Sequence, residues 1–138
     1  MKMVKKIVAI CFMLVLVCFG LVGCETEEEK MATAQEGYEL ALTEWSIIEM
    51  NKNKGVLVTV KQLRDSVISC EVRHLDAYST YYYKINYMDN NGSEKTIYFV
   101  YLPIEGQVNP YIDKDYEQVV KLMDQDKEPG LKAEIKVR

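Results

Sequence analysis

The sequence predicts an α+β domain in which one N-terminal amphipathic helix packs on a curved antiparallel sheet of about four to five strands. Apolar residues recur at helical spacing between residues 32 and 51, and they alternate along several later segments. An Asn-Gly pair between two of those segments is a strong hairpin signal. A long helix laid across an antiparallel sheet lets two half-apolar surfaces bury each other. A short late helix before a C-terminal strand completes the predicted order.

The predicted first helix runs from Ala32 to Asn51. Thr33 and Glu36 match a capping box at its start, and the Asn51–Gly55 stretch supplies lysines and a glycine at its end. The apolar residues that share one face are Ala34, Tyr38, Ala41, Leu42, Trp45 and Ile48.

Two interpretations stay open between residues 56 and 75. The β-branched run Val56–Val60 predicts a short strand. After it, Thr59 and Gln62 could cap a second helix. Against this, Val67–Leu75 alternates as a strand would, and we favour the strand. The helix would bring together Val60, Leu63, Val67 and Cys70, whereas the strand would place Ile68, Cys70 and Val72 on one side.

The hairpin is predicted from Tyr81–Met88 and Glu94–Leu102, which flank the turn Asp89–Ser93. Because side chains alternate along a strand, one face of the first arm is expected to pack on the Trp45 side of the helix. We assign Tyr81, Tyr83, Ile85 and Tyr87 to that inward face, and Tyr82, Lys84 and Asn86 to the outward face.

The rest of the chain predicts a loop, a helix and a strand. Gly106 and Pro110 indicate the loop, and Pro129-Gly130 indicates a turn before the alternating segment Leu131–Val137. A helix is expected over Asp113–Asp124, with its inward side formed by Ile112, Tyr116, Val119, Val120 and Met123. This element order resembles the cystatin-like and nuclear-transport-factor-2-like class, which recurs in small bacterial lipoproteins.

The N-terminus has the three regions of a secretory signal. A lysine-containing start precedes the apolar run Ile7–Val22, which at 16 residues is shorter than the roughly 20 that a spanning helix needs. The run ends in Leu21-Val22-Gly23-Cys24, which resembles the lipobox of bacterial lipoproteins. The resemblance implies that Cys24 carries a diacylglyceryl group and becomes the first mature residue. It divides the chain into a signal peptide (1–23), a lipidated cysteine with an acidic tether (24–32) and one small domain (33–138).

This signal predicts a protein anchored by lipid to the cell membrane and facing its extracytoplasmic side. Removing residues 1–23 takes away three lysines and no acid, so the net charge moves from −4 to −7. Such a charge argues against a nucleic-acid partner, because that affinity comes largely from neutralised phosphates. The glutamates that follow Cys24 are expected to stay hydrated and extended. The lipid on Cys24 makes the membrane the first predicted partner.

The residues usual in catalysis and metal binding are sparse. The one histidine, His74, lies four positions after Cys70, so a thiol–imidazole pair is geometrically conceivable, but two ligands are fewer than a zinc site needs. The acidic run that begins at Asp113 has Gln118 where a calcium loop requires glycine. We therefore predict no enzyme, no catalytic residue, no metal and no cofactor, with Cys70 buried and chemically idle.

Tyrosine is the most unusual feature, with ten in the chain. The neighbours Tyr82 and Tyr83 cannot both face the core, and exposed tyrosine is enriched where proteins bind partners. We therefore predict a binding surface for a protein or peptide, with Tyr82, Tyr98 and Lys84 as its candidate residues. The predicted function is a non-catalytic interaction domain. The alternative is an inhibitor or immunity-type lipoprotein that blocks a protein or peptide target, and the oligomeric state stays open.

Overall fold

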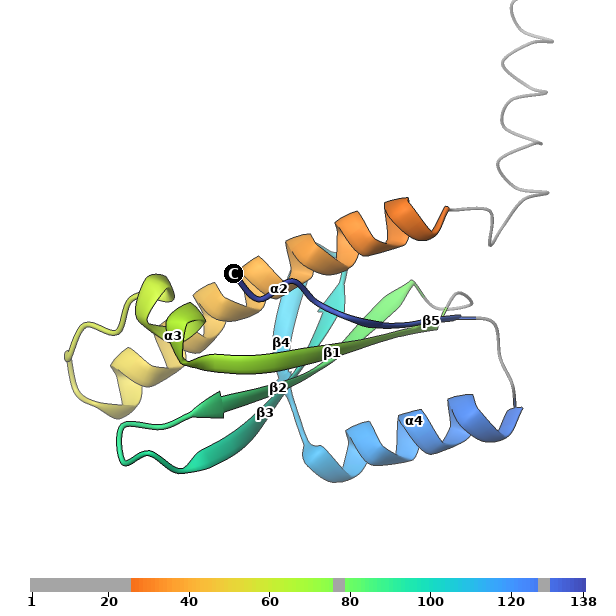
Figure 1. Ribbon diagram of the computed structural model, residues 1–138. Helices are drawn as coiled ribbons and strands as arrows, with labels where there is room; N and C mark the ends of the chain where they lie inside the picture. Colours follow the sequence, from red (N-terminus) through yellow and green to blue (C-terminus); the bar gives the residue numbers. More distant parts are fainter. Residues whose placement is uncertain (1–25, 76–78, 127–129) are drawn as a thin grey trace, which may run out of the picture.

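The computed structural model describes residues 26–75, 79–126 and 130–138, so the predicted signal peptide and Cys24 lie outside the described residues. Its core is an antiparallel sheet of five strands in the order β4-β3-β2-β1-β5. Helix α2 (Glu27–Lys52) crosses one face of this sheet, and α4 (Asp113–Asp126) lies on the other side (Figure 1). The α+β class, the N-terminal helix and the short helix before the last strand are confirmed. None of the described helices is long and apolar enough to cross a bilayer.

Helix α2 begins earlier than predicted. Its N-cap is Thr26, whose hydroxyl accepts the Glu29 N–H at 3.1 Å, and three glutamates occupy the first turn. The helix dipole stabilises negative charge there, so the acidic run starts the helix. The expectation of an extended tether is therefore wrong for residues 27–32. The predicted cap at Thr33 is also wrong, because its hydroxyl bonds the Glu29 carbonyl inside the helix.

The inward face of α2 lies very close to the sheet at Gly37. A Cβ atom at this position would lie 2.2 Å from the Tyr83 hydroxyl and 2.4 Å from the Tyr101 ring. The same Tyr83 hydroxyl donates to the Ala34 carbonyl at 2.7 Å. Glycine therefore sets how closely the two layers approach. The other buried apolar residues on this face are Ala34, Tyr38, Ala41, Leu42 and Trp45, as the periodicity predicts.

The chain after α2 combines the two interpretations of the sequence. Helix α3 (Val60–Ser66) follows Thr59, which forms a complete capping box with Gln62. Strand β1 (Val67–Leu75) begins directly after it. The predicted strand Val56–Val60 is wrong, because residues 56–59 belong to none of the described sheet's strands and Val60 starts α3.

A bulge at the start of β1 changes which residues face the core. The register shifts between Val67 and Ser69, so Val67 is buried and Ile68 is 44% exposed. The predicted placement of Ile68 on the same side as Cys70 and Val72 is therefore wrong. Beyond the bulge the alternation is regular, and Cys70 and Val72 are both buried as predicted.

The hairpin of β2 (Thr80–Met88) and β3 (Glu94–Leu102) is confirmed. Tyr81, Tyr83 and Ile85 are buried on the α2 side. The turn differs from a two-residue Asn-Gly turn, since within residues 89–93 only Gly92 has a positive φ, of 76°. The Asp89 carboxylate instead holds a longer turn together by accepting two backbone N–H groups inside it.

The last part of the chain adds both edges of the sheet. The predicted loop at residues 107–111 is strand β4 (Gln107–Tyr111), whose Pro110 is tolerated because the strand lies at an edge. In α4, Tyr116 and Met123 are buried as predicted, but Ile112 just before it is 61% exposed, which corrects its inward assignment.

Strand β5 (Gly130–Glu134) pairs with β1 on the edge opposite to β4. Beyond it, the Arg138 guanidinium donates to the Val67 carbonyl at 3.0 Å, so the C-terminus lies beside the junction of α3 and β1 (Figure 1).

Candidate functional site

A cleft of about 540 Å³ opens at the end of the domain where α2 finishes. It lies between that end of α2, the loop of residues 53–58, α3 and the tip of the β2–β3 hairpin. We call it the distal cleft, because it lies at the opposite end of α2 from Glu27. Its lining includes Trp45, Glu49, Leu57, Tyr87, Asp89 and Lys95.

Two aromatic rings form the floor of the distal cleft. Trp45, the single tryptophan of the chain, meets Tyr87 edge to face with ring centroids 4.6 Å apart. The indole N–H donates to the Glu49 carboxylate at 3.3 Å. Burial, and then the charge of Glu49, raise the pKa of the Tyr87 phenol. The floor is thus apolar, with the polar group of the tryptophan already satisfied.

One side of the distal cleft is an apolar loop. Lys54 and Gly55 have positive φ values of 48° and 92°, which turn the chain away from α2. Val56 and Leu57 follow and are 59% and 70% exposed. The Ser46 hydroxyl donates to the Val58 carbonyl and fixes the base of the loop to α2. An exposed apolar lip beside an aromatic floor is typical of an interaction site.

The charges at the rim of the distal cleft neutralise one another. Lys95 lies 3.2 Å from Asp89, and Lys52 lies 3.9 Å from Glu49. The pKa of the Asp89 carboxyl is held below its usual value by the Ser93 N–H and then by Lys95. These two acids and two bases leave the rim with no net charge to offer to a ligand.

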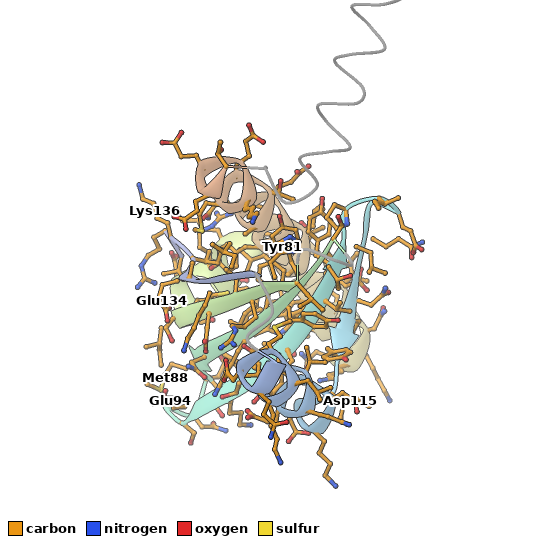
Figure 2. All side chains as sticks on the ribbon, turned by 90° about the vertical axis from the view of Figure 1, so that its right-hand side faces the viewer. Tyr81, Met88, Glu94, Asp115, Glu134 and Lys136 are labelled. Carbon is orange, nitrogen blue, oxygen red and sulfur yellow. The ribbon has the colours of Figure 1, made fainter. Side chains whose placement is uncertain are left out.

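The predicted binding residues Tyr82, Tyr98 and Lys84 come together on the sheet face opposite to α2. Lys84 pairs directly with Tyr98, and Tyr82 lies two residues along the same strand. All three are half-buried, and α4 lies over this face (Figure 2). Tyr82 contacts Tyr111 of β4, with ring centroids 5.5 Å apart. Tyr98 contacts Tyr116 of α4 with ring centroids 4.9 Å apart. The surface is therefore partly covered, and a role of these residues in binding stays a prediction.

The same side of the sheet carries a buried arginine. Arg73 lies 2.5 Å from Asp124 of α4 and 3.8 Å from Glu71 on its own strand. Its charge is thus compensated by two carboxylates. This arrangement ties α4 to the sheet.

Cys70 and His74 do not form a catalytic pair. Four residues along a strand separate them by about 13 Å, which is too far for a direct hydrogen bond. The His74 Nδ1 lies 2.9 Å from the Thr80 carbonyl, and its ring stacks on Tyr81. Cys70 is buried as predicted, and burial raises the pKa of its thiol. Within residues 26–75, 79–126 and 130–138, no cluster of three His, Cys, Asp or Glu residues could hold a metal ion.

Sequence reasoning missed the distal cleft. The available signal was the apolar run Val56–Val58, which stands between a helix stop and a capping box. We interpreted it as a strand of the sheet. Comparison with protein-family models, with curated proteins and with solved structures found no match to this chain.

Proposed function

We propose that this chain is a lipoprotein held by Cys24 on the extracytoplasmic side of the cell membrane, and that its domain binds a protein or peptide partner in the distal cleft without catalysis. The observation that carries the proposal is that the cleft lies at the opposite end of α2 from Glu27, the helical residue nearest to Cys24 in the sequence. Glu27 starts α2 only three residues after Cys24. From Glu27 to Trp45 the helix rises about 27 Å. The start of α2, which follows the proposed anchor in the sequence, and the cleft therefore lie toward opposite ends of one helix.

This geometry replaces the flexible tether with a short connection. Three residue steps span at most about 11 Å, so the first turn of α2 stays close to the lipid headgroups. The glutamates of that turn are exposed and remain in water. A partner can reach the cleft at the other end of α2 while the acyl chains stay in the bilayer.

The chemistry of the distal cleft supports binding of a macromolecule. In protein interfaces, a few residues contribute most of the binding free energy. These residues are often aromatic, and they lie in a desolvated centre that is surrounded by a polar rim. Tyr87, which packs on the buried Trp45, provides such a centre, and Leu57 provides an exposed apolar contact beside it. The carboxylates of the cleft, Glu49 and Asp89, already have partners and serve to shape the rim.

A position-specific crosslink in intact cells tests this proposal. A photoreactive phenylalanine analogue replaces Leu57 in one variant and Ile104 in a matched control, since Ile104 is 87% exposed on the turn between β3 and β4. We expect one adduct of defined mass from position 57 and none of that mass from position 104. A second change in the cleft, Met88→Asp, should remove the adduct. Adducts of the same mass from both positions, unaffected by Met88→Asp, would contradict the proposal.

A further inference from the structure

A second pocket, of about 260 Å³, lies between the C-terminal part of α4, β1 and β5. We call it the arginine pocket, because Arg73 lines it with a side chain that is only 6% exposed. Leu75, Met123 and Leu131 form its apolar part. Since a water molecule takes up about 30 Å³ in the liquid, the space suits a small organic ligand and is too small for a folded segment of a partner.

The guanidinium of Arg73 has hydrogen-bond donors to spare. An arginine side chain carries five N–H groups. Within the described residues, one of them donates a hydrogen bond, to the Asp124 carboxylate. Glu71 lies 3.8 Å from the guanidinium, which makes an ion pair that is too long for a hydrogen bond. A nearly buried cation with donors left over, beside an open pocket, indicates a binding site for an anion that carries oxygen.

We infer that the arginine pocket binds a small aliphatic monocarboxylate, which takes the place of the Asp124 carboxylate on Arg73. The planar guanidinium fork matches the two oxygens of a carboxylate, and such paired bonds are stronger than the single bond to Asp124. The aliphatic chain would lie against Met123 and Leu131, where it leaves water. The arginine pocket and the distal cleft share none of their described lining residues, so this inference does not depend on the function proposed above.

The ion pair of Arg73 and Asp124 can exchange partners because its two members differ in exposure. The side chain of Arg73 is 6% exposed, whereas that of Asp124 is 61% exposed. Turning Asp124 into water costs little, because an exposed carboxylate is well hydrated. Leaving Arg73 unpaired would cost much more, because a buried charge needs compensation. A ligand carboxylate replaces one negative charge by another, so the guanidinium stays compensated in the complex.

The charges around the arginine pocket select a ligand with one negative charge. Lys132 lines the pocket directly opposite Arg73 in the β1–β5 pair, and it has no ion pair within the described residues. Like charges in this arrangement repel each other, and an anion beside both relieves the repulsion. Once Asp124 has turned away, the local charges are these two cations and the carboxylate of Glu71. A monocarboxylate neutralises the remaining positive charge, whereas phosphate or a dicarboxylate would add surplus negative charge.

Nuclear magnetic resonance of the lipidated full chain in phosphatidylcholine nanodiscs tests the inference, with the Nε–H signal of Arg73 as the readout. Butyrate is the probe, titrated at constant ionic strength, and butyramide is an uncharged control of nearly the same shape. We expect a saturable shift of the Arg73 signal with butyrate and none with butyramide. Phosphate and succinate should bind more weakly than butyrate by about threefold or more, because each brings an additional negative charge.

Two pairs of variants test the exchange and the charge selection. Asp124→Asn removes the competing carboxylate and should tighten butyrate binding by about threefold to fivefold. Asp115→Asn removes the same charge near the other end of α4 and should leave the affinity unchanged. Lys132→Gln should weaken butyrate binding by about threefold, whereas Lys136→Gln, beyond the end of β5, should not change it.

A capped dipeptide, acetyl-alanyl-valine, and its C-terminal amide separate two sources of such a carboxylate. Tighter binding of the free dipeptide acid than of butyrate, with no binding of the amide, would assign the pocket to the carboxyl end of a peptide. The reverse order of the two acids would assign it to a free aliphatic acid. Both outcomes support recognition of a carboxylate by Arg73.

The contradicting results are equally distinct. The absence of a saturable Arg73 shift below about 100 mM of these acids, in the wild type and in Asp124→Asn, would overturn the inference. Equal shifts with butyrate and butyramide would show that the pocket does not recognise the carboxylate, which would overturn it as well. Weaker butyrate binding in Asp124→Asn would refute the exchange, and tighter binding of phosphate than of butyrate would refute the charge selection. All of these results leave the distal cleft to its own crosslinking test.

Discussion

Gly37→Ala tests how closely α2 lies against the sheet. On a solvent-facing helix this change should stabilise the protein by about 1 kcal/mol, because alanine is the better helix former. At Gly37 the added Cβ would overlap the Tyr83 hydroxyl at 2.2 Å and the Tyr101 ring at 2.4 Å. Overpacking of this kind costs about 1–3 kcal/mol. Displacing the Tyr83 hydroxyl from the Ala34 carbonyl costs about another 1 kcal/mol. We expect a net destabilisation of about 1–3 kcal/mol.

Denaturant unfolding of the two proteins, followed by far-UV circular dichroism, measures this difference. The control is Ala32→Gly, an exposed position of the same helix, which should cost about 1 kcal/mol from helix propensity alone. An unchanged or increased stability of Gly37→Ala would show that α2 does not contact the sheet at this distance, and the assigned core would then be wrong.

Three further predictions concern single side chains. Tyr83→Ala should lower the free energy of unfolding by about 3–5 kcal/mol because it empties a buried aromatic site, whereas Tyr82→Ala should lower it by about 1 kcal/mol. The opposite order of stability in thermal melts would mean that the strand register is wrong by one residue. The buried thiol of Cys70, with its raised pKa, should react slowly with a thiol reagent at pH 7 in the native protein, and rapid labelling would contradict this. The lowered pKa of Asp89 means that its stabilisation of the hairpin turn is present above about pH 4 and is lost as the pH falls through that lowered value, so the Ser93 amide should exchange faster there. Exchange of this amide that stays unchanged throughout a series from pH 6 down to pH 2, after correction for intrinsic rates, would refute it.

Local patterns in the sequence carried the parts of the fold that were predicted. The inward face of α2 follows from helical spacing, and the hairpin follows from alternation on both sides of the Asp89–Ser93 turn. The remaining parts of the fold depend on contacts between elements that are distant in the sequence. Strand β4 contains a proline and is short, and its strand conformation comes from pairing with β3. The bulge at Val67 reverses the side that Ile68 faces, and no residue type before it signals the shift.

The candidate site was less accessible to sequence reasoning than the fold. The floor of the distal cleft joins Trp45 of α2 with Tyr87 of β2, and only the crossing of helix and sheet brings them together. The tyrosines outside the core were correctly expected on the second sheet face. The sequence did not show that α4 would pack over that face, because the contact of Tyr98 with Tyr116 depends on the path of the chain through β4.

The central claim is that Cys24 anchors this domain to the membrane. Intact-mass analysis of the protein extracted from membranes of a lipoprotein-processing bacterial host tests it most directly. The account predicts a mature chain that begins at Cys24 and carries the mass of a diacylglyceryl group, whereas Cys24→Ala should leave the unprocessed precursor. A wild-type chain that is cleaved elsewhere and carries no acyl mass would contradict the claim.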